Sequence, residues 1–310
     1  MRIVLSDKDL STCSFPADTE WRQISDKNLG DYDGNTDVVA IAGSRAMAIK
    51  AATMQLPSLK LFQLTSAGFD GVPLGKYEEK GVAVANAGSV YSVPIAETVV
   101  FGILLMAKKL RKNPNNRVFK ITRGYKEITE LAKKKTLIMG AGNIGTAVAE
   151  RLRCFDMIID AYDPYCINKP QYNRILRNRD ELLSGIGEYD YIVSTLPDNE
   201  ETRGFINGEL FSQMKNSAVI VNVGRKAVFN NDDFYDVLKR KMIGGAVIDM
   251  FEKLPNPITN RFRRLSNVVV FPGVAAISRE VNGRLKEHMV ENILAVLDGR
   301  MPKNVINGVK

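Results

Sequence analysis

The sequence is poor in the residues that most often bind metals. Among 310 residues it has one histidine, His288, and three cysteines. A zinc site needs three or four such ligands close together, so this composition argues against zinc. The cysteines, Cys13, Cys154 and Cys166, show no paired spacing, which is typical of reduced thiols inside a cell. No metal site is expected.

A long apolar run is also lacking. The longest, from Val99 to Ala107, is far shorter than the ~20 residues that a membrane-spanning helix needs. The N-terminus has only Ile3, Val4 and Leu5 before Asp7, too few for the apolar region of a signal peptide. We therefore expect a cytoplasmic protein that does not associate with membranes.

Positive charge is present but uneven. The net charge is +8, and residues 108–135 hold eleven lysines and arginines but only two acids, Glu127 and Glu130. This basic segment is either a solvated helix end and arm, or a surface that attracts an anionic cofactor, substrate or nucleic acid. Neither stacking aromatics nor a nucleic-acid-binding motif accompanies it, so a nucleic-acid partner is not expected.

Apolar runs of strand length alternate with helical patterns, which indicates an α/β protein with mainly parallel sheets. At 310 residues, two domains are expected. Strands are predicted at 1–5, 37–42, 60–64, 82–85, 137–139, 157–162, 191–194, 218–223, 245–249 and 267–271. Helices are predicted at 45–54, 77–81, 91–111, 146–152, 178–183, 208–214, 232–239 and 279–297, and the tail 301–310 is expected to be irregular.

A glycine motif, GAGNIG at residues 140–145, follows the predicted strand 137–139 and leads into the predicted helix 146–152. In dinucleotide-binding folds the first glycine makes a tight turn, the second lets the backbone approach a pyrophosphate, and the third lets the helix pack on the strand. The helix N-terminus then offers N–H groups to the phosphates. Asp163 ends the next strand. A carboxylate at this position accepts hydrogen bonds from the ribose hydroxyls of NAD and repels the 2′-phosphate of NADP. The sequence therefore predicts an NAD site. The expected contacts in the motif are Gly140, Gly142, Asn143, Ile144 and Gly145.

Two further strand ends carry polar side chains. Arg225 follows the strand 218–223, and Asp249 ends the strand 245–249. Ligands of such folds gather at the carboxyl ends of parallel strands. Arg225 either binds a substrate carboxylate in bidentate fashion or makes a surface salt bridge. Asp249 either accepts from a nicotinamide carboxamide or caps the turn that follows it.

These residues, in this order, resemble the D-isomer-specific 2-hydroxyacid dehydrogenase family over nearly the whole chain after about residue 38. The segment 65–70 (TSAGFD) is similar to the family's substrate-carboxylate loop, where backbone N–H groups, here those of Ser66, Ala67 and Gly68, bind the acid. The segment 86–97 is similar to the crossover into the family's interdomain helix. By this resemblance Arg225 binds the substrate, and the remaining cofactor contacts are Leu196, Pro197, Thr202, Val223, Gly224 and Asp249.

The resemblance also implies an architecture. The family has two Rossmann-like domains, which here would be a flavodoxin-like substrate domain of about 1–90 plus 281–310 and an NAD-binding Rossmann domain of about 91–280. It further implies a homodimer formed through the NAD-binding domain, and a small carboxylate as substrate.

The family's catalytic pair is missing. Members use a histidine as proton donor, and a glutamate just before a proline keeps it charged. Here Leu254 stands in the glutamate's place and Gly273 in the histidine's. Because both are replaced, no unpaired group is left, which indicates a remodelled site. His288 is expected to face solvent on the last helix.

Three side chains are candidate replacement proton donors: Lys226, Tyr91 and Glu252. The favoured function is an NAD-dependent oxidoreductase that transfers a hydride between NAD(H) and a small 2-hydroxy or 2-oxo acid, with an atypical or absent general acid. One alternative is a non-catalytic NAD(H)-binding sensor or scaffold. Another is a reaction that needs no proton from the protein. Selectivity for the substrate's side chain is expected to lie in the N-terminal loops, where Ser44 and Arg45 are a candidate contact.

Overall fold

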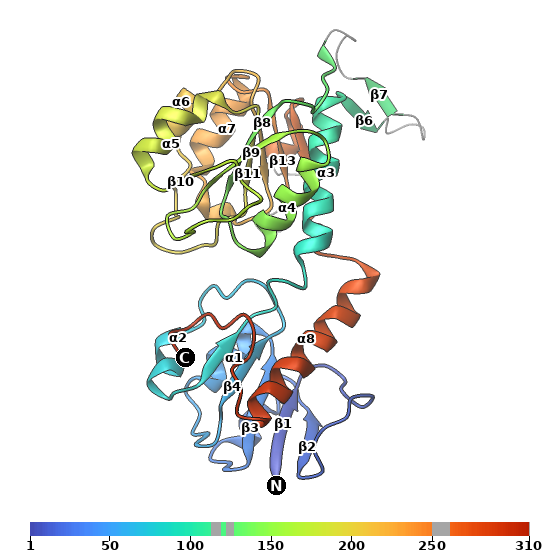
Figure 1. The fold of residues 1–310 in the computed structure, drawn as a ribbon, viewed down its shortest axis with the longest axis vertical. Helices are drawn as coiled ribbons and strands as arrows, with labels where there is room; N and C mark the ends of the chain where they lie inside the picture. Colours follow the sequence, from blue (N-terminus) through green and yellow to red (C-terminus); the bar gives the residue numbers. More distant parts are fainter. Residues whose placement is uncertain (113–118, 122–126, 250–260, 310) are drawn as a thin grey trace. The chain divides into compact units, whose positions relative to one another are not determined.

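The computed structural model describes residues 1–112, 119–121, 127–249 and 261–309. The chain forms two compact units (Figure 1). Unit 1 comprises Met1–Tyr91 together with Ser278–Lys310, and unit 2 comprises Ser92–Ile277. Unit 2 is thus inserted into the sequence of unit 1.

Unit 1 contains a five-stranded parallel sheet in the order β2-β1-β3-β4-β5. Its strands are β1 (Arg2–Ser6), β2 (Thr19–Gln23), β3 (Val38–Gly43), β4 (Leu61–Leu64) and β5 (Ala83–Ala85). This is the flavodoxin-like order, which reverses direction between β1 and β3. Ligands of such sheets bind at the carboxyl ends of the strands beside that switch point.

The helices of unit 1 cover this sheet with two separate cores. One core includes residues of α1 (Arg45–Ala51) and α2 (Leu74–Glu79), for example Met47 and Tyr77. The other includes Leu285, Met289 and Ile293 of α8 (Arg279–Leu297), which contacts β3 and β4. The last helix, red in Figure 1, therefore completes the core of the first unit.

Unit 2 contains a seven-stranded parallel sheet in the order β10-β9-β8-β11-β12-β13-β14. Its switch point lies between β8 and β11. The strands are β8 (Lys135–Met139), β9 (Ile158–Tyr162), β10 (Arg174–Leu176), β11 (Tyr191–Ser194), β12 (Val219–Asn222), β13 (Gly245–Ile248) and β14 (Val268–Val270).

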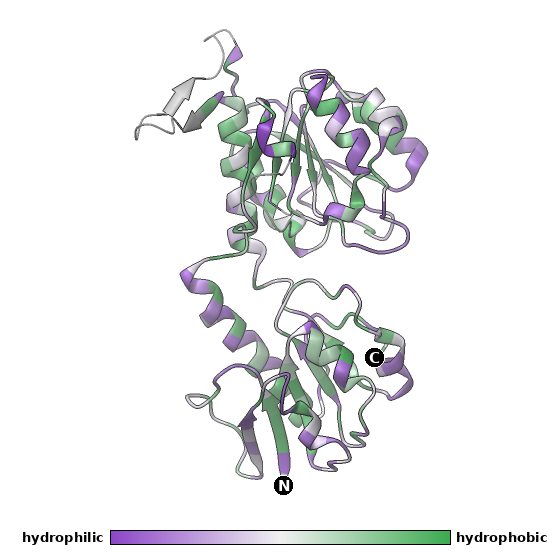
Figure 2. Cartoon of the chain, turned by 180° about the vertical axis from the view of Figure 1, so that it is seen from behind, coloured by the Kyte–Doolittle hydropathy of each residue, from purple (hydrophilic) through white to green (hydrophobic). Residues whose placement is uncertain are grey.

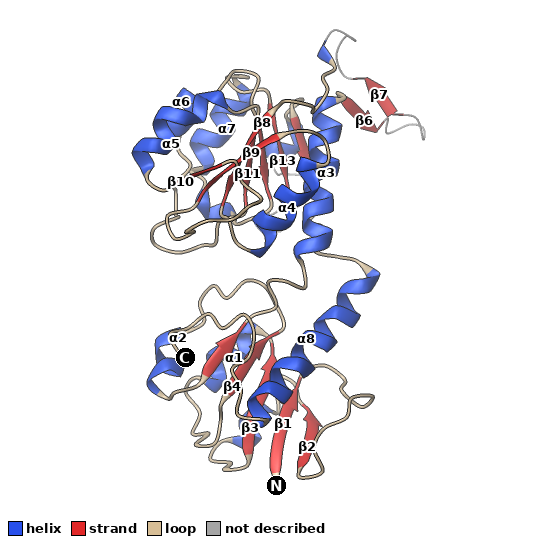
Figure 3. Ribbon diagram, viewed as in Figure 1, coloured by secondary structure: helices blue, strands red, loops and turns tan. Residues whose placement is uncertain are grey.

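Helices cover both faces of this second sheet (Figure 3). One face packs against α3 (Ser92–Ala107) and α4 (Asn143–Arg153), and the other against α5 (Arg179–Gly185), α6 (Gly208–Gln213) and α7 (Asn231–Lys239). A sheet buried on both faces needs apolar side chains on both, which is why its central strands are mostly hydrophobic (Figure 2). The predicted α/β class with mainly parallel sheets is confirmed.

Several element predictions differ from the structure, among them one helix end and two edge strands. The helix predicted at 91–111 ends at Ala107, because Lys109 adopts a left-handed φ of 52° and β6 (Leu110–Lys112) begins directly after it. Neither β2 nor β10 is predicted, because both are short edge strands, with sequences TEWRQ and RIL, that lack a continuous apolar pattern.

The basic segment contains a small antiparallel pair of strands, β6 and β7 (Phe119–Ile121). Residues 113–118 and 122–126 of this segment lie outside the described residues, so both interpretations of its charge stay predictions. Among the described residues, no helix combines the length and the hydrophobicity that crossing a bilayer would require.

Candidate functional site

The glycine motif joins β8 to α4 at the switch point of unit 2. A Cβ on Gly145 would lie 2.0 Å from the carbonyl oxygen of Gly140, so only glycine permits this close packing. A Cβ on Gly142 would meet nothing within 4 Å, and Gly142 offers no side chain to cap α4. The first turn of α4 therefore has uncapped N–H groups beside open space. A pyrophosphate fits such a cradle, so the residues present fit a dinucleotide.

Asp163 ties this loop to the segment after β9. Its Oδ2 accepts from the Ala141 N–H at 2.8 Å, and its Oδ1 accepts from the N–H groups of Tyr165 and Cys166 at 2.9 and 3.1 Å. The side chain stays half-exposed, and a carboxylate can accept about four hydrogen bonds. Asp163 therefore keeps capacity to accept from a ribose.

Lys169 is a contact of the glycine loop that the sequence does not predict. Its Nζ donates to the Ala141 carbonyl at 2.5 Å and to Thr146 Oγ1 at 3.0 Å. No motif marks this lysine, because it reaches the loop from a turn more than twenty residues further along the chain. It places a positive charge beside the proposed phosphate site.

The loops after β11 and β12 lie across the switch point from β8. Leu196 is buried, whereas Pro197 is exposed and its carbonyl accepts from Thr202 Oγ1 at 2.6 Å. The N–H groups of Val223 and Gly224 both donate to the carbonyl of the last residue of β11, at 3.2 and 3.0 Å. These hydrogen bonds hold the two loops together at the edge where the glycine motif lies.

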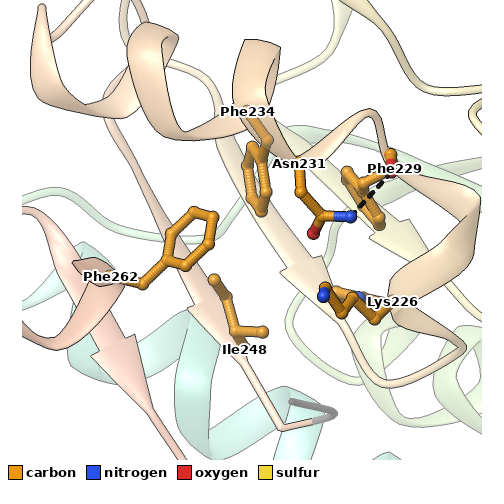
Figure 4. A pocket seen from close by; sticks show the side chains of 7 residues that line it. Lys226, Phe229, Asn231, Phe234, Ile248 and Phe262 are labelled. Carbon is orange, nitrogen blue, oxygen red and sulfur yellow. Dashed lines mark hydrogen bonds between the residues drawn. The ribbon is translucent and has the colours of Figure 1, made fainter. Parts of the chain in front are cut away.

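Arg225 and Lys226 follow directly. Arg225 is half-buried, and its Nη1 donates to the Gly224 carbonyl at 3.2 Å. Lys226 lines a pocket to which three phenylalanine rings contribute, shown in Figure 4. The lining residues are Asn222, Lys226, Phe229, Asn231, Phe234, Ile248 and Phe262. Lys226 thus borders an apolar pocket within unit 2, and its role as a proton donor stays a prediction.

Asp249 is buried, with 4% of its surface exposed, and holds the loop after β14. Its carboxylate accepts from the Val274 N–H at 2.9 Å and from the Ala275 N–H at 3.3 Å. Burial raises the pKa of Asp249, although these hydrogen bonds and one with Gly273 act to lower it. Asp249 therefore holds the loop after β14, and the turn that directly follows Asp249 lies outside the described residues, so both interpretations of Asp249 stay predictions.

Gly273, in the place of the family's histidine, has a φ of +72°. A Cβ at this position would meet nothing within 4 Å, so the space is open but the backbone favours glycine. Its N–H donates to the Asp249 carbonyl at 3.1 Å. Leu254 and Glu252 lie outside the described residues.

In unit 1, the loop Thr65–Asp70 after β4 has its carbonyl groups engaged by the protein. Each of its first four carbonyl oxygens accepts a hydrogen bond. The donors are Tyr91 Oη to Thr65 (2.6 Å), the Ala87 N–H to Ser66 (3.1 Å), Asn86 Nδ2 to Ala67 (2.9 Å) and Ser66 Oγ to Gly68 (2.7 Å).

The N–H groups of the same loop are differently placed. Those of Ser66, Ala67 and Gly68 make no hydrogen bond to any residue that the structure describes. All three residues are half-buried, and backbone N–H groups away from solvent need an acceptor. Successive N–H groups of this kind form a binding site for an anion such as a carboxylate.

Tyr91 holds this loop. Its hydroxyl proton is donated to the Thr65 carbonyl, and burial raises the pKa of the phenol, with a smaller contribution from Asp7. A hydroxyl engaged in this way is a poor proton donor to a substrate. The structure thus favours a positioning role for Tyr91.

The prediction that His288 faces solvent is wrong. Only 8% of its surface is exposed, and its Nε2 lies 3.0 Å from the Asn86 carbonyl oxygen, to which it donates as the Nε2–H tautomer. The error arises because position 288 falls on the face of α8 that is buried, together with Leu285, Met289 and Asn292.

Among the described residues, no group of three or more histidine, cysteine, aspartate or glutamate side chains is placed to hold a metal ion. Unit 2 thus has the fold and the glycine loop of a dinucleotide-binding oxidoreductase domain. Comparison with known proteins gives the family: residues 102–275 match the D-isomer specific 2-hydroxyacid dehydrogenase, NAD binding domain. The chain belongs to the D-isomer specific 2-hydroxyacid dehydrogenase family, as its motifs predicted.

Relatives cover most of the chain. It is 30% identical over 265 residues to a glyoxylate reductase of Korarchaeum cryptofilum, covering 81% of this chain and 77% of that protein. It is 28% identical over 284 residues to glyoxylate/hydroxypyruvate reductase B of Pectobacterium carotovorum, covering 89% and 88%. The fold is similar to that of the NADPH-dependent glyoxylate/hydroxypyruvate reductase of Sinorhizobium meliloti in complex with NADP and malonate, with a TM-score of 0.75, 20% identity and coverage of 99% and 97%.

Proposed function

We propose that this protein is an NAD-dependent oxidoreductase that transfers a hydride between NAD(H) and a small 2-hydroxy or 2-oxo acid, without the family's general acid. The observation that supports it best is the loop of Ser66–Gly68, whose N–H groups lack an acceptor among the described residues. A non-catalytic NAD sensor would have no need of such an anion site. The reductases to which the chain is similar are named for 2-oxo acids.

Unit 2 would bind the cofactor, which supplies or accepts the hydride. The glycine loop and the first turn of α4 would bind the pyrophosphate, Asp163 the adenosine ribose, and Asp249 the nicotinamide. The loops after β11 and β12 would line the dinucleotide through Leu196, Pro197, Thr202, Val223 and Gly224.

We infer NAD rather than NADP from Asp163. Its carboxylate would repel a 2′-phosphate. Lys169 is the nearby cation, but its Nζ already donates to Ala141 and Thr146. The Sinorhizobium meliloti structure is of an NADPH-dependent enzyme, so the test compares binding of both dinucleotides. Replacing Asp163 by serine should lower the Kd for NADPH relative to the Kd for NADH. Asp156→Ser, the control, should leave this ratio unchanged.

The substrate's carboxylate would be bound by the N–H groups of Ser66, Ala67 and Gly68 and by the guanidinium of Arg225. Arg225→Ala should raise the KM for the acid about a hundredfold, the loss typical of a charged hydrogen-bonded pair. Arg240→Ala, an exposed arginine at the end of α7, is the matched control. An unchanged KM in Arg225→Ala would remove Arg225 from the site.

The decisive experiment measures NADH and NADPH oxidation at high enzyme concentration against a panel of 2-oxo acids, with cofactor binding followed by fluorescence. Turnover should be slow, because the loss of a general acid costs roughly 10²–10⁴-fold. Tight NADH binding without turnover on any acid would overturn this proposal in favour of the sensor. A homodimer formed through unit 2 and a cytoplasmic location also stay predictions.

A further inference from the structure

The N–H groups proposed to bind the substrate's carboxylate take their direction from one short segment of unit 1. A trans peptide bond is planar, so the N–H of each residue points away from the carbonyl of the residue before it. The carbonyl groups of Thr65–Ala67 therefore set the directions of the N–H groups of Ser66–Gly68. Their hydrogen-bond donors are Asn86, Ala87 and Tyr91, which lie within six residues of one another.

The C-terminal part of unit 1 holds this donor segment in place. His288 of α8 donates from Nε2 to the Asn86 carbonyl at 3.0 Å. Arg284, one helical turn earlier, donates from Nε to the Val90 carbonyl at 3.3 Å. In the tail after α8, the carbonyl of Asn304 accepts from the Asn86 N–H at 3.1 Å. The last helix and the tail thus fix the segment that fixes the loop Thr65–Asp70.

Asn86 links the two sets of hydrogen bonds. Its side-chain Nδ2 donates to the Ala67 carbonyl at 2.9 Å, while its backbone is held by His288 and Asn304. Its Oδ1 accepts from the Gly88 N–H at 3.1 Å. Backbone and side chain of Asn86 are therefore both engaged, and a polar network satisfied in this way favours a single arrangement. The position of the Nδ2 donor thus depends on the groups that hold the backbone of Asn86.

The imidazole of His288 is committed to this contact. A carbonyl oxygen can only accept, so the ring carries a proton on Nε2 when it bonds to Asn86. Asn292 Nδ2 lies 3.4 Å from the same nitrogen, but it donates at shorter distances to Gln63 Oε1 (2.6 Å) and to the Lys303 carbonyl (3.0 Å). The ring itself is buried, with 8% of its surface exposed. Removing it would leave the Asn86 carbonyl without this donor.

We propose that His288 is a positioning residue for substrate binding, which acts through Asn86 to keep the loop Thr65–Asp70 in the shape that binds a carboxylate. The inference rests on the proposed function. No motif marks His288, and position 288 lies outside the residues 102–275 that match the family's domain. Because His288 acts through Asn86, its loss should weaken binding of the acid and leave binding of NADH unchanged.

The test compares three substitutions of His288 in the full chain saturated with NADH, by calorimetric titration with oxamate, an unreactive 2-oxo acid analogue. Glutamine places an N–H donor near the position of Nε2, whereas asparagine is too short and leucine has no donor. His288→Leu and His288→Asn should raise the Kd for oxamate about fivefold, and His288→Gln should stay within about twofold of the parent. Glu287→Gln, an exposed change on the neighbouring residue, is the matched control and should equal the parent.

A double-mutant cycle separates positioning from a general loss of stability. If His288 acts through Asn86, the combination of His288→Leu with Asn86→Ala should bind oxamate no more weakly than Asn86→Ala alone. With a reducible 2-oxo acid, His288→Leu should raise KM and leave kcat little changed. A parental oxamate Kd in His288→Leu, additive losses in the double variant, or a His288→Gln variant as weak as His288→Leu would each overturn the proposal.

The oxamate titration also keeps this inference apart from the proposed function. If the parent binds oxamate but reduces no 2-oxo acid, the oxidoreductase is overturned, while the titrations still decide the role of His288. If the parent reduces a 2-oxo acid and His288→Leu binds oxamate like the parent, only the role of His288 is overturned. A parent that binds no oxamate would overturn both.

Discussion

The glycine loop of unit 2 and the loop Thr65–Asp70 of unit 1 differ in what mainly fixes their shape. In unit 2, Gly145 packs against Gly140 within one turn, and Asp163 and Lys169 add hydrogen bonds from further along the chain. In unit 1, the loop Thr65–Asp70 is held by side chains from elsewhere, notably Asn86 and Tyr91. The first kind of site is read from a short motif. The second kind forms only when segments far apart in the sequence come into contact. Its shape can therefore be changed by substituting the side chains that hold it, such as Asn86 and Tyr91.

The largest effect on ligand binding is expected from a substitution in the glycine loop of unit 2. Gly145→Ala pushes a methyl group against the Gly140 carbonyl, so we expect NADH binding to weaken by about a hundredfold or more and unit 2 to lose stability. Fluorescence titration and calorimetric unfolding measure the two effects. Gly142→Ala should lose binding yet keep its melting temperature, because its Cβ meets no protein atom. Parental binding in Gly145→Ala would contradict the account.

Substrate binding by the loop Thr65–Asp70 should weaken when a side chain that holds the loop is removed. Asn86→Ala removes the hydrogen bond to the Ala67 carbonyl, worth about 1–1.5 kcal/mol, so the KM for the acid should rise roughly tenfold. The Kd for NADH should not change, because Asn86 belongs to unit 1. Gln55→Ala, an exposed change in the same unit, is the control. If cofactor binding fell in parallel with substrate binding, the two loops would not be independent.

A smaller effect is expected at Gly273, where the φ of +72° disfavours any side chain. Gly273→Ala should destabilise unit 2 by about 1–2 kcal/mol. Gly283→Ala, in the exposed part of α8, should stabilise slightly because that glycine is helical with open space around it. Chemical unfolding gives both values, and a neutral Gly273→Ala would mean that the loop relaxes.

The smallest effect concerns Asp249. Burial raises its pKa in the folded state, so the folded state binds a proton more readily than the unfolded one. The group's contribution to stability is then fully present at low pH and is lost as pH rises through the folded pKa. Asp249→Asn should therefore gain up to about 4 °C in melting temperature at pH 7 and nothing at pH 3. A loss of stability at pH 7 would show that the hydrogen bonds to Val274 and Ala275 outweigh burial.

Much of unit 2 could be predicted because its signals lie close together in the sequence. Strand, glycines and helix occupy one continuous stretch, and Asp163 ends the next strand. Lys169 contacts the same loop but could not be predicted, because the neighbouring sequence does not indicate which residues a long lysine side chain will contact.

Unit 1 was harder to predict for the same physical reason. The family resemblance of residues 65–70 implies a carboxylate loop, but the hydrogen bonds that hold this loop depend on contacts between segments far apart in the chain. His288 shows this best: its hydrogen bond to Asn86 spans about two hundred residues of sequence.

The insertion of unit 2 into unit 1 has a consequence for synthesis of the chain. All of Ser92–Ile277 leaves the ribosome before α8, so unit 2 can finish folding first although unit 1 begins the sequence. Until α8 arrives, the apolar face of β3 and β4 that it covers has no partner. The loop Thr65–Asp70 is held by Asn86, and Asn86 is held by His288 of that helix, so this arrangement is among the last to form during translation.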